Sequence, residues 1–209
     1  MRPQAHALFL AFALALSITL TAAVADTRLN SNQITNSLQG VSDTPLALTA
    51  AELRQRAVDN VRTFPGPTPV DHLLVIPQLD KLAQFTVEIN FDFNSAAIKS
   101  ESYRDVGAIA DALHNPILLG YGILVIGHTD TVGGREYNLG LSQRRADAIR
   151  AALIDPFGVN PGVLQAVGLG EEQLQDPKHP TAAVNRRVQL VNIGKRFCFG
   201  RSGEQFQCP

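Results

Sequence analysis

The sequence predicts an α+β domain in which helices pack on one face of a mixed four-stranded sheet. Between residues 85 and 193, stretches with strand or helix periodicity follow in the order strand, helix, strand, helix, strand, strand. Each helical stretch is followed by a pair that disfavours further helix, Asn115-Pro116 and Asp155-Pro156. A sheet and helices in this order bury their apolar faces against each other, so two packed layers are expected.

The first strand is predicted from strict alternation over residues 85–93. The residues between the apolar positions are polar, which is typical of a half-buried strand. The apolar face consists of Phe85, Val87, Ile89, Phe91 and Phe93.

The remaining elements follow from residue spacing. Ser100 to His114 has apolar residues at helical intervals, and Tyr121 to Gly127 is almost continuously apolar. Such a run is typical of a central strand that is covered on both faces. A long helix through Arg145 comes next, and residues 163–167 and 187–193 are predicted as the last two strands.

Composition sets the limits of the fold and of its partners. The chain has 209 residues, 45% hydrophobic and 18% charged, which is enough for one sizeable domain with extensions. Its formal net charge of -1 argues against a nucleic-acid partner, which would require a basic surface.

Residues 1–25 are predicted to be a secretory signal peptide. An alanine- and leucine-rich run from Ala5 to Leu20 is followed by Ala23-Val24-Ala25, which has small residues at the positions that a cleavage site needs. The mature chain is therefore expected to begin at Asp26. The alternative is an uncleaved membrane anchor, because the run is nearly long enough to span a bilayer.

Residues 26–84 are predicted to be an N-terminal segment that contains one amphipathic helix. The stretch from 26 to 41 fits a short helix and disorder equally well. Thr49 and Glu52 have the spacing of a capping box, and a helix with Leu53 and Ala57 on its apolar side follows. Phe64-Pro65-Gly66-Pro67 would end it and act as a linker, so the simplest interpretation is a spacer with one packed helix.

Residues 195–209 are predicted to be a tail closed by a disulfide. Cys198 and Cys208 are the only two cysteines of a chain that is expected to be exported. The loop between them is short, so the bridge would mainly rigidify the tail. A CxxC redox motif is excluded by the spacing, and a zinc site by the number of ligands.

The richest chemistry lies between Gly127 and Ala146, in the sequence GHTDTVGGREYNLGLSQRRA. Asp130 follows the central strand, and Arg145 lies in the helix that comes next. Because helical side chains lean toward the helix N-terminus, the two can face one pocket and bind a zwitterion. Without further information, a weak surface ion pair would be the more common arrangement.

This stretch resembles the signature of the OmpA-like C-terminal domain family, the peptidoglycan-binding module of Gram-negative envelopes. GHTD, the glycine turn, YN, LS and RRA occur in register, and Gly168-Leu169-Gly170-Glu171 and Asn185-Arg186-Arg187-Val188 resemble later motifs of the family. The resemblance covers about residues 85–194. It implies an OmpA-like β-α-β-α-β-β sandwich that binds peptidoglycan without catalysis.

The resemblance also implies a ligand and a set of site residues. Asp130 would take the ammonium of a meso-diaminopimelate side chain in the peptidoglycan stem peptide, and Arg145 would take its carboxylate. Relatives carry an aspartate where this chain has Asn94, so one charge is missing. The other residues expected around the ligand are Phe93, Asn94, Ser95, Thr131, Gly133, Asn138 and Leu141.

Other roles for nearby polar residues carry less weight. His128 and Asp130 are only two possible ligands, and no third ligand is in register with them, so no metal site is expected, and no cofactor is implied. Arg186 and Arg187 are interpreted as strand-edge charges with one structural ion pair rather than as ligands.

Two other classes of function were weighed against a peptidoglycan anchor. A hydrolase is excluded because the sequence has neither an activated nucleophile nor suitably placed paired carboxylates around the motif. The remaining alternative is an envelope adaptor, whose N-terminal segment or tail binds an outer-membrane or secretion partner while the domain anchors it. Both place the protein in the periplasm, associated with peptidoglycan and the cell outer membrane.

Overall fold

The computed structural model describes residues 29–40, 49–64, 79–195, 197–199 and 205–207, the last two ranges through their backbone. The predicted signal peptide, the proline-glycine part of the linker and Cys208 lie outside the described residues. The signal peptide and the disulfide therefore remain predictions. In the tail, β5 (Phe197–Phe199) and β6 (Gln205–Gln207) form a two-stranded antiparallel hairpin.

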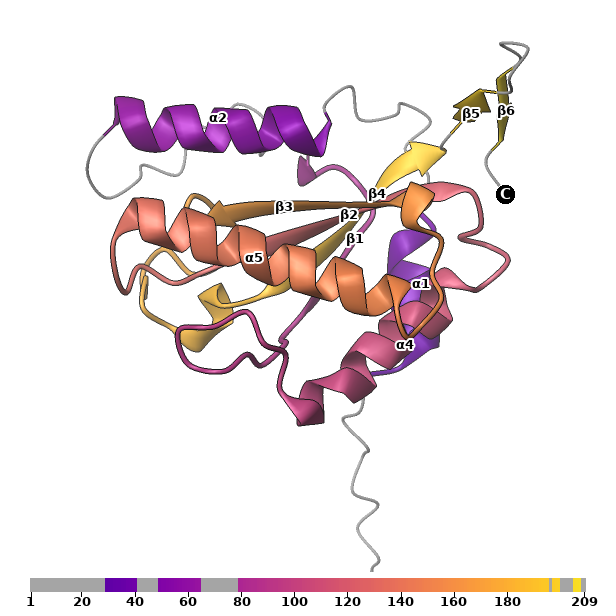
Figure 1. Ribbon diagram of the computed structural model, residues 1–209, viewed down its shortest axis with the longest axis horizontal. Helices are drawn as coiled ribbons and strands as arrows, with labels where there is room; N and C mark the ends of the chain where they lie inside the picture. Colours follow the sequence, from indigo (N-terminus) through magenta and orange to yellow (C-terminus); the bar gives the residue numbers. More distant parts are fainter. Residues whose placement is uncertain (1–28, 41–48, 65–78, 196, 200–204, 208–209) are drawn as a thin grey trace, which may run out of the picture.

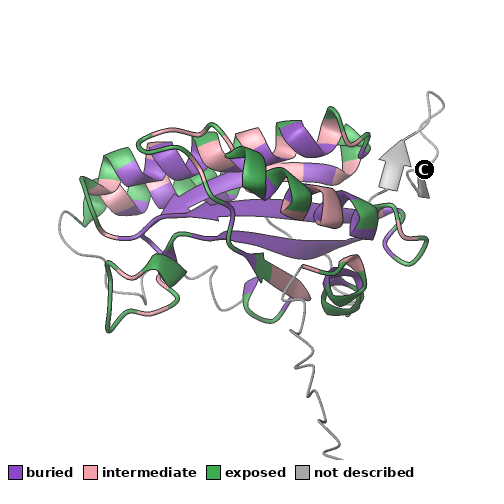
Figure 2. Ribbon diagram, turned by 90° about the horizontal axis from the view of Figure 1, so that it is seen from below, coloured by how far each residue is buried: buried purple, intermediate pink, exposed green. Residues whose placement is uncertain are grey.

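A mixed four-stranded sheet forms the centre of the fold, as the sequence predicts. Its strands are β1 (Gln84–Val87), β2 (Tyr121–His128), β3 (Leu164–Gly170) and β4 (Val188–Lys195), in the spatial order β1-β4-β2-β3. β2 pairs with β3 in parallel, while β4 is antiparallel to both β1 and β2. In Figure 2 the two central strands, β2 and β4, are almost entirely buried, as expected for the middle of a sheet that is covered on both sides.

The first face of the sheet packs against the two helices that the domain sequence predicts. These are α4 (Tyr103–Leu113), which follows the 3-10 turn η1 (Ser100–Ser102), and α5 (Arg135–Ile154). The side chains that meet in this layer include Val106, Ile109, Ile123, Val125, Ile149, Leu153 and Leu190.

A third helix lies on this face, within residues 26–41, whose sequence fits a short helix and disorder equally well. α1 (Ser31–Leu38) is helical, with an Asn30 side chain that accepts a hydrogen bond from the Asn32 amide at its N-terminus. Its two apolar side chains, Ile34 and Leu38, are completely buried in the same layer. α1 is thus a packed part of the fold.

The second face of the sheet is covered by α2 (Ala50–Thr63), which Figure 1 shows on the opposite side of the sheet from α4. Leu124 and Ile126 of β2 alternate with the side chains of the first face and meet Leu53 and Ala57 of α2. The predicted capping box between Thr49 and Glu52 is present in full. The prediction that helices pack on one face of the sheet holds for α4 and for most of α5. The helix α2 of the N-terminal segment adds a layer on the other face. With two packed helices, that segment is more than the simple spacer predicted.

The first predicted strand is shorter than its alternation suggests. Regular pairing ends at Val87, and beyond it Phe91 forms only a single bridge with Ile98. The chain then turns back, with the Asp92 amide donating to the Ala97 carbonyl over 3.0 Å and Asn94 adopting a φ of 55°. Phe93 is completely exposed, so its placement on a buried strand face is wrong.

The short elements η2 (Pro161–Val163) and η3 (Ala183–Asn185) introduce β3 and β4. Within the described ranges, no helix is both long enough and apolar enough to cross a membrane.

Candidate ligand-binding site

A pocket opens where β2 ends and α5 begins, beside the turn that follows β1. Its volume is about 600 Å³, and both Asp130 and Arg145 line it. Of the other predicted site residues, those that also line it are Phe93, Asn94, Gly133, Asn138 and Leu141. The structure thus brings together groups that are more than fifty positions apart in sequence.

Two predicted site residues, Ser95 and Thr131, do not line this pocket. Each contributes through a backbone hydrogen bond instead. The Ser95 carbonyl accepts a hydrogen bond from Arg145 Nε over 3.0 Å, so Ser95 orients the arginine from outside the pocket. The Thr131 amide donates to the Pro180 carbonyl over 3.2 Å, which fixes the loop after β2 against the segment before β4. Both residues support the walls rather than forming them.

Arg145 projects from α5 with its guanidinium held on one side only. Its carbon Cζ lies 4.8 Å from the centre of the Phe91 ring, and Nε is engaged by Ser95. Burial lowers the pKa of Arg145 from its ordinary value, while Tyr137 and Asp130 oppose that shift. Among the described residues no carboxylate forms an ion pair with Arg145. Its remaining donors are therefore available to an anionic ligand group.

Asp130 lies on the other side of the pocket and is only 7% exposed. One carboxylate oxygen accepts from the Val132 amide over 3.1 Å, and the other lies 2.7 Å from Arg186 Nη1. The predicted structural ion pair of Arg186 is therefore made with the site aspartate. Arg186 also lines the pocket, a role that sequence reasoning missed.

Tyr137 is a second pocket residue that the sequence analysis did not assign. Its hydroxyl donates a hydrogen bond to the Asn94 side-chain oxygen, which joins α5 to the turn after β1. That contact holds the turn in its left-handed backbone conformation at Asn94. In the sequence, Tyr137 shares helical spacing with Leu141, Ala148 and Ala152, and a position on such an apolar stripe usually indicates packing.

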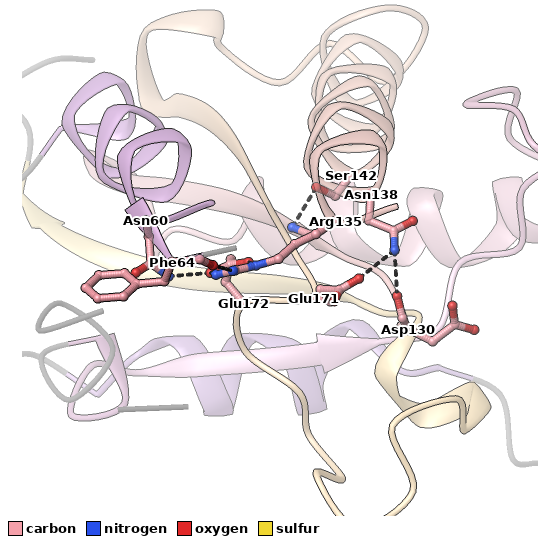
Figure 3. Close-up of polar contacts among 9 residues, drawn as sticks. Asn60, Phe64, Asp130, Arg135, Asn138, Ser142, Glu171 and Glu172 are labelled. Carbon is pink, nitrogen blue, oxygen red and sulfur yellow. Dashed lines mark hydrogen bonds and ion pairs between the residues drawn. The ribbon is translucent and has the colours of Figure 1, made fainter. Parts of the chain in front are cut away.

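A buried polar network supports the loop that carries Asp130. Figure 3 shows Asn138 between the backbone carbonyl of Asp130 and the carboxylate of Glu171, with its Nδ2 donating over 3.2 Å and 2.7 Å respectively. Burial raises the pKa of Glu171, and the bond from Asn138 opposes the shift. Asn138 therefore holds the loop in place in addition to lining the pocket.

The His128 side chain lies on the second face of the sheet, where it meets Gln189. It is 2% exposed, its Nε2 lies 2.9 Å from Gln189 Oε1, and its Nδ1 has no hydrogen-bond partner among the described residues. Burial, and after it the charge of Arg187, lowers the pKa of His128 well below its ordinary value. The described residues contain no group of three or more His, Cys, Asp or Glu side chains that could hold a metal ion.

His128 should make stability depend on pH. Since its pKa is lower in the folded state than in the unfolded chain, its contribution is present above about pH 6.5 and is lost as the pH falls below that value. One such group gives a slope of at most about 1.4 kcal/mol per pH unit. Urea denaturation at pH 7.5 and 5.5 should show a smaller difference for His128→Gln than for the parent. If the free energy of unfolding changed equally between the two pH values in variant and parent, this prediction would be wrong. Glu171, whose raised pKa has the opposite effect, is present in both proteins, so its contribution cancels when variant and parent are compared.

The comparisons with known proteins identify the family. Residues 90–187 match the model of the OmpA family. Outer membrane porin F of Pseudomonas aeruginosa is 35% identical over 115 residues, which cover 54% of this chain and 32% of the porin. The peptidoglycan-associated lipoprotein of the same organism is 36% identical over 102 residues, or 48% and 58% of the two chains.

Among solved structures, the peptidoglycan-associated lipoprotein from Burkholderia pseudomallei is 35% identical and covers 49% of this chain and 86% of that one, with a TM-score of 0.42. Because that score is low, the family assignment depends on the sequence matches. Residues 90–187 of the chain therefore form an OmpA family domain. The match spans only 32 to 58% of these curated relatives. α1, α2 and β1 lie outside the matched residues.

Proposed function

We propose that the pocket binds the diaminopimelate side chain of a peptidoglycan stem peptide and so anchors the protein non-covalently to the cell wall. The observation that carries this proposal is the separation of charge in the pocket, with Asp130 on one wall and on another Arg145, which has no ion-pair partner among the described residues. The free end of diaminopimelate carries one ammonium and one carboxylate. Relatives whose names place them in the outer membrane or with peptidoglycan support the same role.

Arg145 is suited to the carboxylate. Its planar guanidinium can donate two parallel hydrogen bonds, which are short and strong when the acceptor is charged. Stacking on Phe91 and the bond to the Ser95 carbonyl restrict the orientation of that group before ligand arrives. Little entropy is then lost on binding, which favours affinity.

Asp130 is suited to the ammonium, and Arg186 prepares it. The ion pair with Arg186 places a positive charge beside the largely buried carboxylate before binding. The Arg186 side chain is 48% exposed, so it can move aside at little cost when an ammonium approaches. Asn94, which is neutral, would add a hydrogen bond rather than a second negative charge.

The role proposed for the whole protein is non-catalytic and lies in the envelope. Export to the periplasm through the predicted signal peptide would bring the pocket to the peptidoglycan layer. Binding of this kind needs no cofactor and no metal.

Co-sedimentation of the mature chain with isolated sacculi tests the proposal. The parent should pellet with sacculi, and Asp130→Ala should weaken binding by at least about tenfold, because a charged contact to the ammonium is worth about 1.5 to 3 kcal/mol. Asp111→Ala is the matched control, since Asp111 is an exposed aspartate on α4 that does not line the pocket. A parent chain that stays in the supernatant would reject the proposal.

An adaptor role is a second candidate, favoured by the groove between α2 and α5. Val58, Val61 and Leu139 line it together with Arg54 and Arg62, and its volume is about 240 Å³. Deleting residues 26–84 is a poor test because it would uncover the second face of the sheet. Reversing both arginines to glutamate should instead leave sacculus binding intact while reducing cross-linking to an outer-membrane protein.

A further inference from the structure

The C-terminal end of α2 is joined to the ligand pocket by two sets of polar contacts, which the peptide bond between Glu171 and Glu172 connects. Figure 3 shows these residues in a row, from Asn60 of α2 and Phe64, which follows the helix, to Asp130. α2 lies outside residues 90–187, the part that matches the family. The contacts therefore connect a segment outside the matched residues with the site that lies within them.

The first part of the row is an ion pair that α2 completes. Arg135, at the start of α5, donates to Glu172 from Nε over 2.5 Å and from Nη2 over 2.6 Å. Asn60 Nδ2 donates to the same carboxylate over 2.5 Å, and the Phe64 carbonyl accepts from Arg135 Nη1. The Glu172 side chain is 1% exposed, so these donors replace the water that it lacks.

The second part of the row leads from Glu172 to the pocket. Glu172 follows Glu171 in a tight turn, in which the Glu172 amide donates to the Leu169 carbonyl over 3.0 Å. Fixing the carboxylate of Glu172 therefore fixes the backbone that carries Glu171. Glu171 holds Asn138, which in turn donates to the Asp130 carbonyl.

We propose that α2 positions the ligand pocket, with Asn60 setting the loop from Asp130 to Gly133 through Glu172, Glu171 and Asn138. This inference rests on the proposed function for its effect on affinity, but not for its effect on the loop. Asn60 is a positioning residue because it touches neither the pocket nor the ligand. Without its bond, the Glu172 carboxylate would keep its ion pair with Arg135 but lose one buried donor, and its shift toward the remaining donors would move the turn that presents Glu171.

Hydrogen exchange of the ligand-free full chain tests the positioning directly. Asn60→Leu keeps the volume but removes the donor, and the Val132 amide, which donates to the Asp130 carboxylate, should exchange about tenfold faster. Leu53→Ala is the matched control, because Leu53 anchors α2 through apolar packing alone and is 2% exposed. It should weaken the packing of α2 while leaving the Asn60 donor in place, so exchange at Val132 should rise much less than in Asn60→Leu. Equal rates for the two variants at matched global stability would overturn the proposal.

Affinity for a diaminopimelate-containing muropeptide gives the second readout. Asn60→Leu should weaken binding about three- to tenfold, and Leu53→Ala, which keeps the Asn60 donor, should weaken it less. In a Glu171→Ala background Asn60→Leu should cause no further loss, since both changes act through one chain of contacts. Additive losses would overturn the inferred route. If the parent itself binds no muropeptide, the proposed function fails, while the exchange result still decides whether α2 positions the loop.

Discussion

Replacing Arg145 with alanine is expected to lower affinity for diaminopimelate stem peptides at least tenfold and to abolish their preference over lysine stems. A lysine stem ends in an ammonium alone, which Asp130 can still accept. The guanidinium would then be left partly buried with no anion, a loss on the order of 2 to 5 kcal/mol. Since about 1.4 kcal/mol corresponds to a factor of ten, the parent should discriminate clearly between the two stems.

Arg145→Lys separates charge from geometry. Lysine retains the positive charge but cannot donate two parallel hydrogen bonds, so it should recover little of the lost affinity. Arg104→Ala is the matched control, because Arg104 is an exposed arginine of α4 away from the pocket. Calorimetry with both stem types measures all three variants. Equal affinity of the parent for the two stems, or undiminished binding by Arg145→Ala, would show that the pocket assignment is wrong.

The placement of Asp130 and Arg145 was predictable because local rules decide it. An apolar run that ends in a polar residue gives the strand exit, and helical spacing turns Arg145 toward it. The capping box at Thr49 was predictable for the same reason, since it depends on residues three positions apart.

The features that escaped prediction depend on contacts distant in sequence. Arg186 reaches Asp130 across 56 positions, and Asn60 reaches Glu172 across 112. No periodicity records such pairs. Phe93 fits the alternation of its strand, yet the backbone turn at Asn94 directs it into solvent. The alternation was real, but the pairing partner that would have extended β1 was absent beyond Val87.

The contact between α5 and β3 should be as decisive for folding as Arg145 is for binding. Gly168→Ala would place a methyl group 2.5 Å from Gln143 Cα and still closer to its amide nitrogen. These are backbone atoms that cannot rotate away. The contact is also fixed by two bonds of 2.8 Å, from the Gly168 amide to Gln143 and from the Gly170 amide to Ser142. Separating helix and strand would break both.

Gly168→Ala is therefore expected to lower the free energy of unfolding by about 3 kcal/mol or more, at the upper end of overpacking effects. Gly140→Ala is the matched control, since its added carbon would meet only the flexible end of Arg144 at 3.4 Å. Alanine is the better helix former there by about 0.5 to 1 kcal/mol, so that variant should be as stable as the parent or more so. Urea denaturation measures both. If Gly168→Ala unfolded at the same urea concentration as the parent, α5 could not pack on β3 as closely as in this structure. The position of Arg145 relative to Asp130 would then be wrong as well, because Arg145 is carried by α5.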